Sequence, residues 1–253
     1  GHGSPHYLRT DRGSRLAAEC ALDCVCEFLD TIKDHEFVLD DEKLRDDLLQ
    51  QLWKNIVTRW KSRVEADFRS EPFTEEELDR IPEEFAVYRS LYEKGEFLSS
   101  YGTTLAFIVA TDYFAFCGQI GDGKCVAADA DGNFEQPVPW DDKCFLNTTT
   151  SMCDSEAIIN FRHYYSEKLP AAVFLCSDGI DDSFSGDEKL NGFYKTVLQS
   201  FSTSDIDDAV SELREYLPRL SAKGSGDDVS VAVLFDMDGI AGISGNNNGS
   251  VTK

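Results

Sequence analysis

The sequence predicts an α+β fold, in which helices and antiparallel strands come from separate stretches of the chain. Near the N-terminus, two long segments repeat apolar residues every three or four positions, as amphipathic helices do. Between residues 103 and 128, three short β-branched and apolar runs are instead separated by turn residues. The chain of 253 residues, 42% of them hydrophobic, suits one domain of generous size or one domain with an insertion.

The N-terminal helices are defined by their apolar stripes. The first is predicted over residues 14–29, with Ser14 as its N-cap, and the second over residues 41–66. The second helix should pack on the first, and the acidic residues at its start suit the helix dipole. Residues 67–100 are mixed and charged. Within them Thr74 and Glu77 have the spacing of a capping box, which predicts a short helix in a peripheral connection.

The middle of the chain is rich in strand-forming residues. Strands are predicted over residues 103–111, 113–120 and 124–128, and Gly121-Asp122-Gly123 has the chemistry of a hairpin turn. Three consecutive strands joined by tight turns predict an antiparallel meander.

The C-terminal half alternates helices and strands. A helix is predicted over residues 204–217, capped by Ser204 and ended by Pro218. The other predicted elements are helices over 154–167 and 187–200 and strands over 171–176 and about 228–236. Residues 239–253, rich in Gly, Asn and Ser, predict a disordered tail after a domain that covers residues 1–238.

Acidic residues dominate the charge, since 47 Asp and Glu against 24 Lys and Arg give a net charge of -23. A field of this sign repels nucleic acid and anionic membranes, so we expect neither as a partner. It also repels phosphorylated substrates, unless metals or local arginines reverse the potential. The 8 cysteines include no CxxC pair, and several lie in apolar segments, which favours reduced thiols in a cytosolic protein.

Acidic residues occur where several predicted strands begin or end. Asp122 and Asp178 each follow a predicted strand, and Asp227 precedes the last one. A carboxylate at the end of a buried strand is held rigidly at a rim that solvent, a metal or a substrate can reach. Several converging carboxylates bind hard divalent cations. We therefore expect these turns to form a metal site.

Five short motifs give the acidic turns a common context. In chain order they are Gly1-His2-Gly3, Gly102-Thr103-Thr104-Leu105, Gly121-Asp122-Gly123-Lys124, Ser177-Asp178-Gly179 with Asp182 a few residues on, and Asp227-Asp228-Val229-Ser230. Each motif is weak alone, but together and in this order they resemble those of the metal-dependent type 2C protein Ser/Thr phosphatases. The resemblance spans about residues 1–236.

The resemblance implies a four-layer α-β-β-α sandwich, with two antiparallel sheets flanked by helix pairs. It implies an enzyme that hydrolyses phosphoserine and phosphothreonine in proteins, with two Mn²⁺ or Mg²⁺ ions and a third, weaker site. His2 is the implied general acid, because the pKa of an imidazole lies near working pH. The implied metal ligands are the backbone carbonyl of Gly1 and the carboxylates of Asp122, Asp178, Asp182 and Asp227.

The resemblance also implies a cellular setting: a cytoplasmic monomer of a bacterial signalling system, with a phosphoprotein substrate and a cognate Ser/Thr kinase. In the family a strand pair precedes Gly1 and supplies a phosphate-binding Arg, a Glu-Asp pair near the metals and the Asp directly before Gly1. The sequence starts after these residues, so we expect this chain by itself to be poorly active and marginally stable. Gly123-Lys124 replaces the usual Ser-Arg, and Ser4-Pro5 follows Gly3, which suggests a divergent branch.

Two alternatives stay open on the sequence alone. One is a non-catalytic regulatory or binding module of the same fold that keeps the acidic rim. The other is a partner-switching phosphatase that acts on anti-sigma-factor antagonists. Acidic residues directly upstream of Gly1 would favour catalysis.

Overall fold

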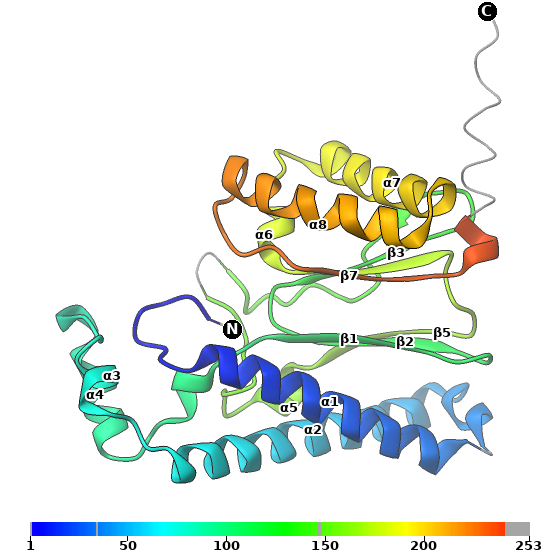
Figure 1. The fold of residues 1–253 in the computed structure, drawn as a ribbon. Coiled ribbons are helices and arrows are strands. Elements are labelled where there is room, and N and C mark those ends of the chain that lie inside the picture. Colours follow the sequence, from blue (N-terminus) through cyan, green and yellow to red (C-terminus); the bar gives the residue numbers. More distant parts are fainter. Residues whose placement is uncertain (1, 34, 146–147, 241–253) are drawn as a thin grey trace, which may run out of the picture. The chain divides into compact units, whose positions relative to one another are not determined.

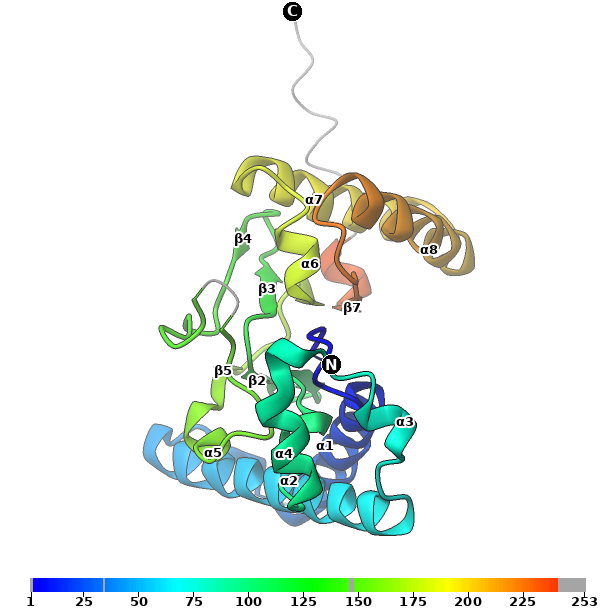
Figure 2. The same ribbon diagram turned by 90° about the vertical axis from the view of Figure 1, so that its left-hand side faces the viewer.

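The structure is a computed structural model, and it describes residues 2–33, 35–145 and 148–240 (Figures 1 and 2). The chain divides into two compact units. The first comprises Gly1–Phe107, Gly118–Gly121 and Asp141–Arg162, and the second comprises Ile108–Cys117, Asp122–Trp140 and His163–Lys253. Among the described residues, no helix is both long and apolar enough to cross a membrane.

The first unit is built on two long helices, α1 (Thr10–Ile32) and α2 (Glu42–Ser70), joined by the 3-10 helix η1 (Glu36–Leu39). Both predicted helices are confirmed and are longer than predicted. Ser14 was expected to cap α1 but lies inside it, because the helix starts one turn earlier. The helices pack closely, since the indole N–H of the fully buried Trp60 donates to the Gly13 carbonyl at 2.9 Å.

The connection after α2 has a small core of its own. It contains α3 (Glu75–Leu78), η2 (Glu83–Phe85), α4 (Ala86–Glu93) and η3 (Leu98–Tyr101). The predicted capping box is confirmed, because Thr74 accepts from the Glu77 N–H while the Glu77 carboxylate accepts from the Thr74 N–H. Leu78, Ile81 and Tyr92 are buried together and attract apolar side chains from residues 8 and 73–91. The segment is therefore a packed part of the first unit.

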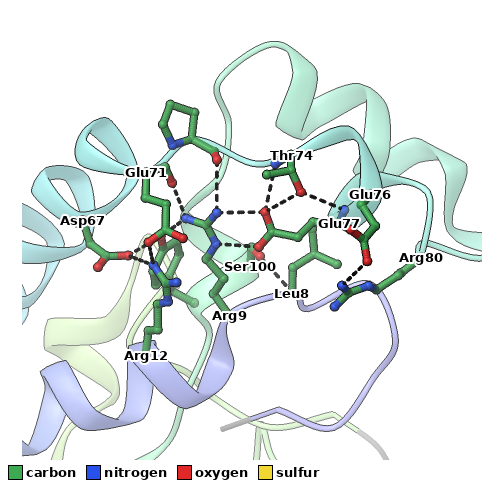
Figure 3. A network of polar contacts seen from close by, with 12 residues as sticks. Leu8, Arg9, Arg12, Asp67, Glu71, Thr74, Glu76, Glu77, Arg80 and Ser100 are labelled. Carbon is green, nitrogen blue, oxygen red and sulfur yellow. Dashed lines mark hydrogen bonds and ion pairs between the residues drawn. The ribbon is translucent and has the colours of Figure 1, made fainter.

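Arg9 ties this segment to the start of α1 (Figure 3). Its side chain is only 2% exposed. The guanidinium forms a two-pronged contact with Glu77, with both N···O distances at 3.0 Å. Its remaining hydrogen bonds go to the carbonyls of Glu71 and Pro72 and to the hydroxyl of Tyr101. A charge this deeply buried is tolerated because each part of its planar group has an acceptor.

The Arg9–Glu77 pair makes stability depend on pH at the acidic end. Hydrogen bonds from Arg9 are the main reason that the pKa of Glu77 is lowered from 4.5 to about 2. Because the folded-state pKa is the lower one, this stabilisation is complete above the ordinary pKa and is lost as the pH falls toward about 2. We expect urea unfolding of the wild type to show a decrease in the free energy of unfolding across that pH window. The decrease should be smaller in Glu77→Gln. Equal losses in both proteins would contradict this assignment.

The first sheet has three strands in the order β1-β2-β5: β1 (Leu105–Ala110), β2 (Ala115–Ile120) and β5 (Arg162–Ser166). The predicted helix over 154–167 is wrong. Its place is taken by the single-turn helix α5 (Ala157–Asn160) followed by β5. The run His163-Tyr164-Tyr165 explains the difference, because aromatic residues favour strands and sheet pairing outweighs a weak helical pattern.

The second unit contains a four-stranded antiparallel sheet in the order β4-β3-β6-β7. Its strands are β3 (Lys124–Ala128), β4 (Phe134–Glu135), β6 (Ala172–Cys176) and β7 (Val231–Phe235). Val126, Phe174 and Val233 lie in register across it. The predicted meander is wrong, because β3 pairs with β4 and β6 in this sheet and β2 belongs to the other. The turn at residues 121–123 therefore passes between sheets.

Two helices cover one face of this sheet, α7 (Asp187–Thr203) and α8 (Ile206–Lys223) (Figure 1). Asp205, not Ser204, caps α8 by accepting from the Asp207 N–H. Pro218 lies inside the helix, which continues for more than a turn and buries Leu220 in the core. These two details correct the prediction.

The core under α7 and α8 also includes Ile240, which is 1% exposed. Gly239 lies against Ala171. The first two residues of the predicted tail thus pack on the domain, and residues 241–253 lie outside the described part of the chain. With two antiparallel sheets and their helices, the structure confirms the α+β class.

Candidate metal centre

Asp178 is the central residue of the acidic set. It follows β6 and opens the short helix α6 (Asp178–Asp181), which contacts β6 and α8 (Figures 1 and 2). Burial is the main reason that the pKa of its carboxyl is raised, and the charge of Asp122 comes next. Asp227 and Asp182 raise the pKa further. Asp122, Asp182 and Asp227, which derive from three separate segments, therefore each lie near enough to Asp178 for their charges to act on its carboxyl.

The segments around Asp178 are held by hydrogen bonds between Ser177 and the backbone of Asp228 and Ser230. The Ser177 N–H donates to the Ser230 carbonyl at 3.0 Å, and the Ser230 N–H donates to the Ser177 hydroxyl at 3.0 Å. The Ser177 hydroxyl in turn donates to the Asp228 carbonyl at 3.2 Å. Ser177 thus secures the loop that carries Asp227 beside the end of β6.

Two motif glycines allow these segments to approach. A Cβ atom at Gly179 would lie 2.5 Å from the Asp228 carbonyl oxygen, and one at Gly123 would lie 2.8 Å from that of Cys176. Neither distance is possible for a real side chain, so the glycines are required by the packing of one backbone on another. This is a physical reason for glycine in the Ser-Asp-Gly and Gly-Asp-Gly motifs.

An ion pair joins two of the acidic segments. Lys124 Nζ lies 2.6 Å from Asp181 Oδ1, with both side chains at least two-thirds buried. Lys124 follows Asp122 closely in the chain, and Asp181 lies on α6 between Asp178 and Asp182. No sequence motif gives Asp181 a role. Its partner could not be found from spacing, since the two residues are far apart in the chain.

The chemistry of this set fits a hard divalent cation. Its donors are carboxylate oxygens, which Mn²⁺ and Mg²⁺ prefer. Their mutual repulsion, visible in the raised pKa of Asp178, is what a bound cation would relieve. However, within the part of the chain that the structure describes, no three or more His, Cys, Asp or Glu side chains are placed around a common point at metal-binding distance.

His2 belongs to the first unit and is held in a defined position. Its Nε2 lies 2.8 Å from the Ser151 hydroxyl, and its N–H donates to the Gly102 carbonyl at 3.2 Å. A Cβ atom at Gly102 would lie 2.5 Å from His2 Cδ2, so the glycine of the Gly-Thr-Thr motif makes room for the imidazole. Ser151 gave no signal in the sequence. Gly1, the other implied N-terminal site residue, lies outside the described residues.

A family model described as Protein phosphatase 2C matches residues 1–218. The match covers most of the chain, includes the motifs around His2, Asp122 and Asp178, and ends before Asp227. The protein therefore belongs to the protein phosphatase 2C family, which confirms the resemblance seen in the sequence.

Solved structures of bacterial phosphatases are similar to the chain. The catalytic domain of the serine threonine protein phosphatase PstP, in complex with 2 manganese ions, is 17% identical with a TM-score of 0.45, covering 87% of this chain and 79% of that one. PppA, a regulatory component of T6SS in Pseudomonas aeruginosa, is 19% identical with a TM-score of 0.43, covering 74% and 67%. A point mutant of a bacterial serine phosphatase is 14% identical with a TM-score of 0.46, covering 76% and 70%. No curated protein matches the chain.

Proposed function

We propose that this protein hydrolyses phosphoserine and phosphothreonine in protein substrates, and that the reaction depends on Mn²⁺ or Mg²⁺. The observation that carries the proposal is the state of Asp178. Its carboxyl is partly buried, and its pKa is raised by burial and by three neighbouring carboxylates. A partly buried carboxylate among other carboxylates destabilises the fold when no cation is bound. We therefore expect this arrangement where a bound cation is needed for function. Family membership supports the same activity.

Each site residue has a distinct role in this proposal. Asp178 and Asp227 would hold two ions together with the carbonyl of Gly1, and Asp122 and Asp182 would join Asp178 at a third. The ions would supply Lewis acidity and offset negative charge. His2 would donate a proton to the departing serine or threonine oxygen, because an alkoxide is a poor leaving group unless it is protonated. The hydrogen bond with Ser151 would orient the imidazole for that transfer.

The charge of the protein explains why cations are needed for binding as well. With a net charge of -23 and carboxylates at the site, the metal-free protein repels a phosphate group. Cations reverse the potential locally. We also propose that the protein acts in the cytoplasm as a monomer, opposite a cognate Ser/Thr kinase. All 8 cysteines are free, which fits a reducing compartment.

A pair of neighbouring substitutions tests the metal role of Asp227. Asp227→Asn removes a charge from the proposed ion site and should lower Mn²⁺-dependent hydrolysis of a phosphothreonine peptide at least about a hundredfold. EDTA should abolish the wild-type activity. Asp228→Asn makes the same chemical change one residue later, at a carboxylate with no proposed metal role, and should keep wild-type activity.

The comparison also separates catalysis from a purely structural effect. Both aspartates are exposed in the same loop, so a general disturbance of that loop would affect the two variants alike. Wild-type turnover in Asp227→Asn, or an equal loss in both variants, would reject the assignment. Tight binding of a phosphopeptide with no turnover would instead favour the non-catalytic module.

A further inference from the structure

The residue before Asp122 has an unusual backbone. Gly121 directly follows β2 and has a φ of 104°, a backbone conformation that residues with side chains rarely adopt. A Cβ atom there would lie 2.2 Å from Cγ2 of Thr104. The direction in which the chain leaves β2, and hence the starting point of Asp122, is therefore set at this one glycine.

A buried hydrogen-bonded chain holds the Gly121 N–H. The N–H donates to the Thr150 hydroxyl at 3.1 Å, and the Thr150 hydroxyl donates to Asp141 Oδ2 at 2.8 Å. Thr150 is 4% exposed and Asp141 is 8% exposed. Because the only proton of the hydroxyl goes to the carboxylate, its lone pair is free to accept from Gly121. The direction of each bond in the chain is thus determined.

The carbonyl of the same residue is held by a cation. Arg162 donates from Nη2 to the Gly121 carbonyl, and its Nε lies 3.8 Å from Asp141 Oδ2. Burial acts to raise the pKa of Asp141, but bonds from Thr150 and the Lys143 N–H and the charge of Arg162 lower it overall. Asp141 is therefore an ionised carboxylate that accepts hydrogen bonds.

We propose that Asp141, Thr150 and Arg162 are positioning residues for Asp122: they clamp the peptide groups on both sides of Gly121 and so fix the backbone from which the Asp122 side chain starts. The inference rests on the proposed function, because it takes Asp122 as a metal ligand. None of the three side chains is itself assigned to metal or substrate. Outer groups that orient a ligand in this way typically change metal affinity about 10- to 100-fold when removed.

The geometry favours this role over simple packing. An ordinary strand end needs no ionic partners, because water or a neighbouring strand satisfies its peptide groups. Here the Asp141 carboxylate, through Thr150, holds the Gly121 N–H, and the Arg162 guanidinium holds the Gly121 carbonyl. The side chains of Asp141 and Arg162 are both largely buried. Burying such a pair is costly, and in some proteins it is retained because it specifies a conformation.

The clamp is tested by Mn²⁺ titration of the protein, with free Mn²⁺ followed by electron paramagnetic resonance. Thr150→Val removes the hydroxyl at nearly constant volume and should weaken Mn²⁺ binding about 10- to 100-fold. Thr150→Ser keeps the hydroxyl and should bind nearly as well as wild type. Thr148→Val, the same substitution at an exposed position two residues away, is the matched control and should change nothing.

A double substitution shows whether the effect passes through Asp122. In an Asp122→Asn background, Thr150→Val should cause no further loss of Mn²⁺ affinity, because the group that it positions is gone. Wild-type affinity in Thr150→Val, or the same loss with and without Asp122, would overturn the inference. Asp178→Asn in the same assay checks the proposed function separately: if that variant binds Mn²⁺ like wild type, the metal site itself is wrong.

Discussion

Replacing Asp178 with Asn is expected to lower metal-dependent phosphatase activity at least about a hundredfold and, in the same protein, to raise the melting temperature measured without metal. The loss of activity follows from removing the charge that the proposed ions share. The gain in stability follows because the ionised carboxyl is disfavoured by burial and by its acidic neighbours, as the raised pKa shows.

The pH dependence of that gain has a defined sign. A carboxyl with a raised folded-state pKa destabilises the fold at pH values above that pKa. This destabilisation disappears as the pH falls below the pKa that the carboxyl has in the unfolded chain. The difference in melting temperature between Asp178→Asn and wild type should therefore shrink on acidification. Asp112→Asn, which removes the same charge from an exposed turn of the second unit, is the control and should change neither activity nor stability much.

Two outcomes would contradict this reasoning. If Asp178→Asn kept wild-type turnover, the carboxylate would not be a metal ligand. If the variant lost activity and also had a lower melting temperature without metal, Asp178 would stabilise the fold. The raised pKa would then not reflect a loss of stability that metal binding requires.

The largest effect on stability is expected for Arg9→Ala. The substitution leaves Glu77 without its partner and removes the bonds to two carbonyls and to the Tyr101 hydroxyl. Breaking a buried pair in this way typically costs about 3–5 kcal/mol. Arg9→Lys keeps the charge but cannot make the two-pronged contact, so it should fall between wild type and the alanine variant.

Arg80 provides the matched control in the same part of the fold. It pairs with Glu76 one helical turn away, and both side chains are exposed (Figure 3). Surface pairs of this kind contribute about 0–1 kcal/mol, so Arg80→Ala should be close to neutral. Urea unfolding of the three variants gives the comparison. If Arg9→Ala cost no more than Arg80→Ala, the network of Figure 3 would contribute little to stability.

Local patterns in the sequence predicted the elements that are decided locally. The apolar stripe of α2 ends in fully buried Trp60 and Val64, and the capping box of α3 forms as its spacing predicts. The capping box joins residues near in the chain, and the stripe of α2 is set by spacing within one helix, although Trp60 then contacts Gly13 of α1. Residues 162–166 show the opposite case. Their helical pattern was overruled by pairing in a sheet whose other strands lie far away in sequence.

The residues of the candidate site also fall into those that local motifs identify and those that they do not. Asp122, Asp178 and Asp227 could be named because each sits in a short motif beside a strand. The turn between Ile120 and Lys124 looked like a hairpin because glycine and aspartate favour one, and nothing local shows that the next strand joins another sheet. Asp141, Thr150 and Arg162 had no signal at all, because the clamp is formed by residues that share no repeat or motif.

The contact of Gly179 has a consequence for how such a site can evolve. Gly179 faces the carbonyl oxygen of Asp228, and a backbone atom is present whatever amino acid that segment carries. A substitution elsewhere can replace a crowding side chain, but none can delete a carbonyl. Compensatory change is therefore closed to this glycine, while it stays open to the aspartates, whose charge a neighbouring residue can take over. As lineages diverge, we expect this glycine to be the last residue of the Ser-Asp-Gly motif to change, even in members that have lost their activity.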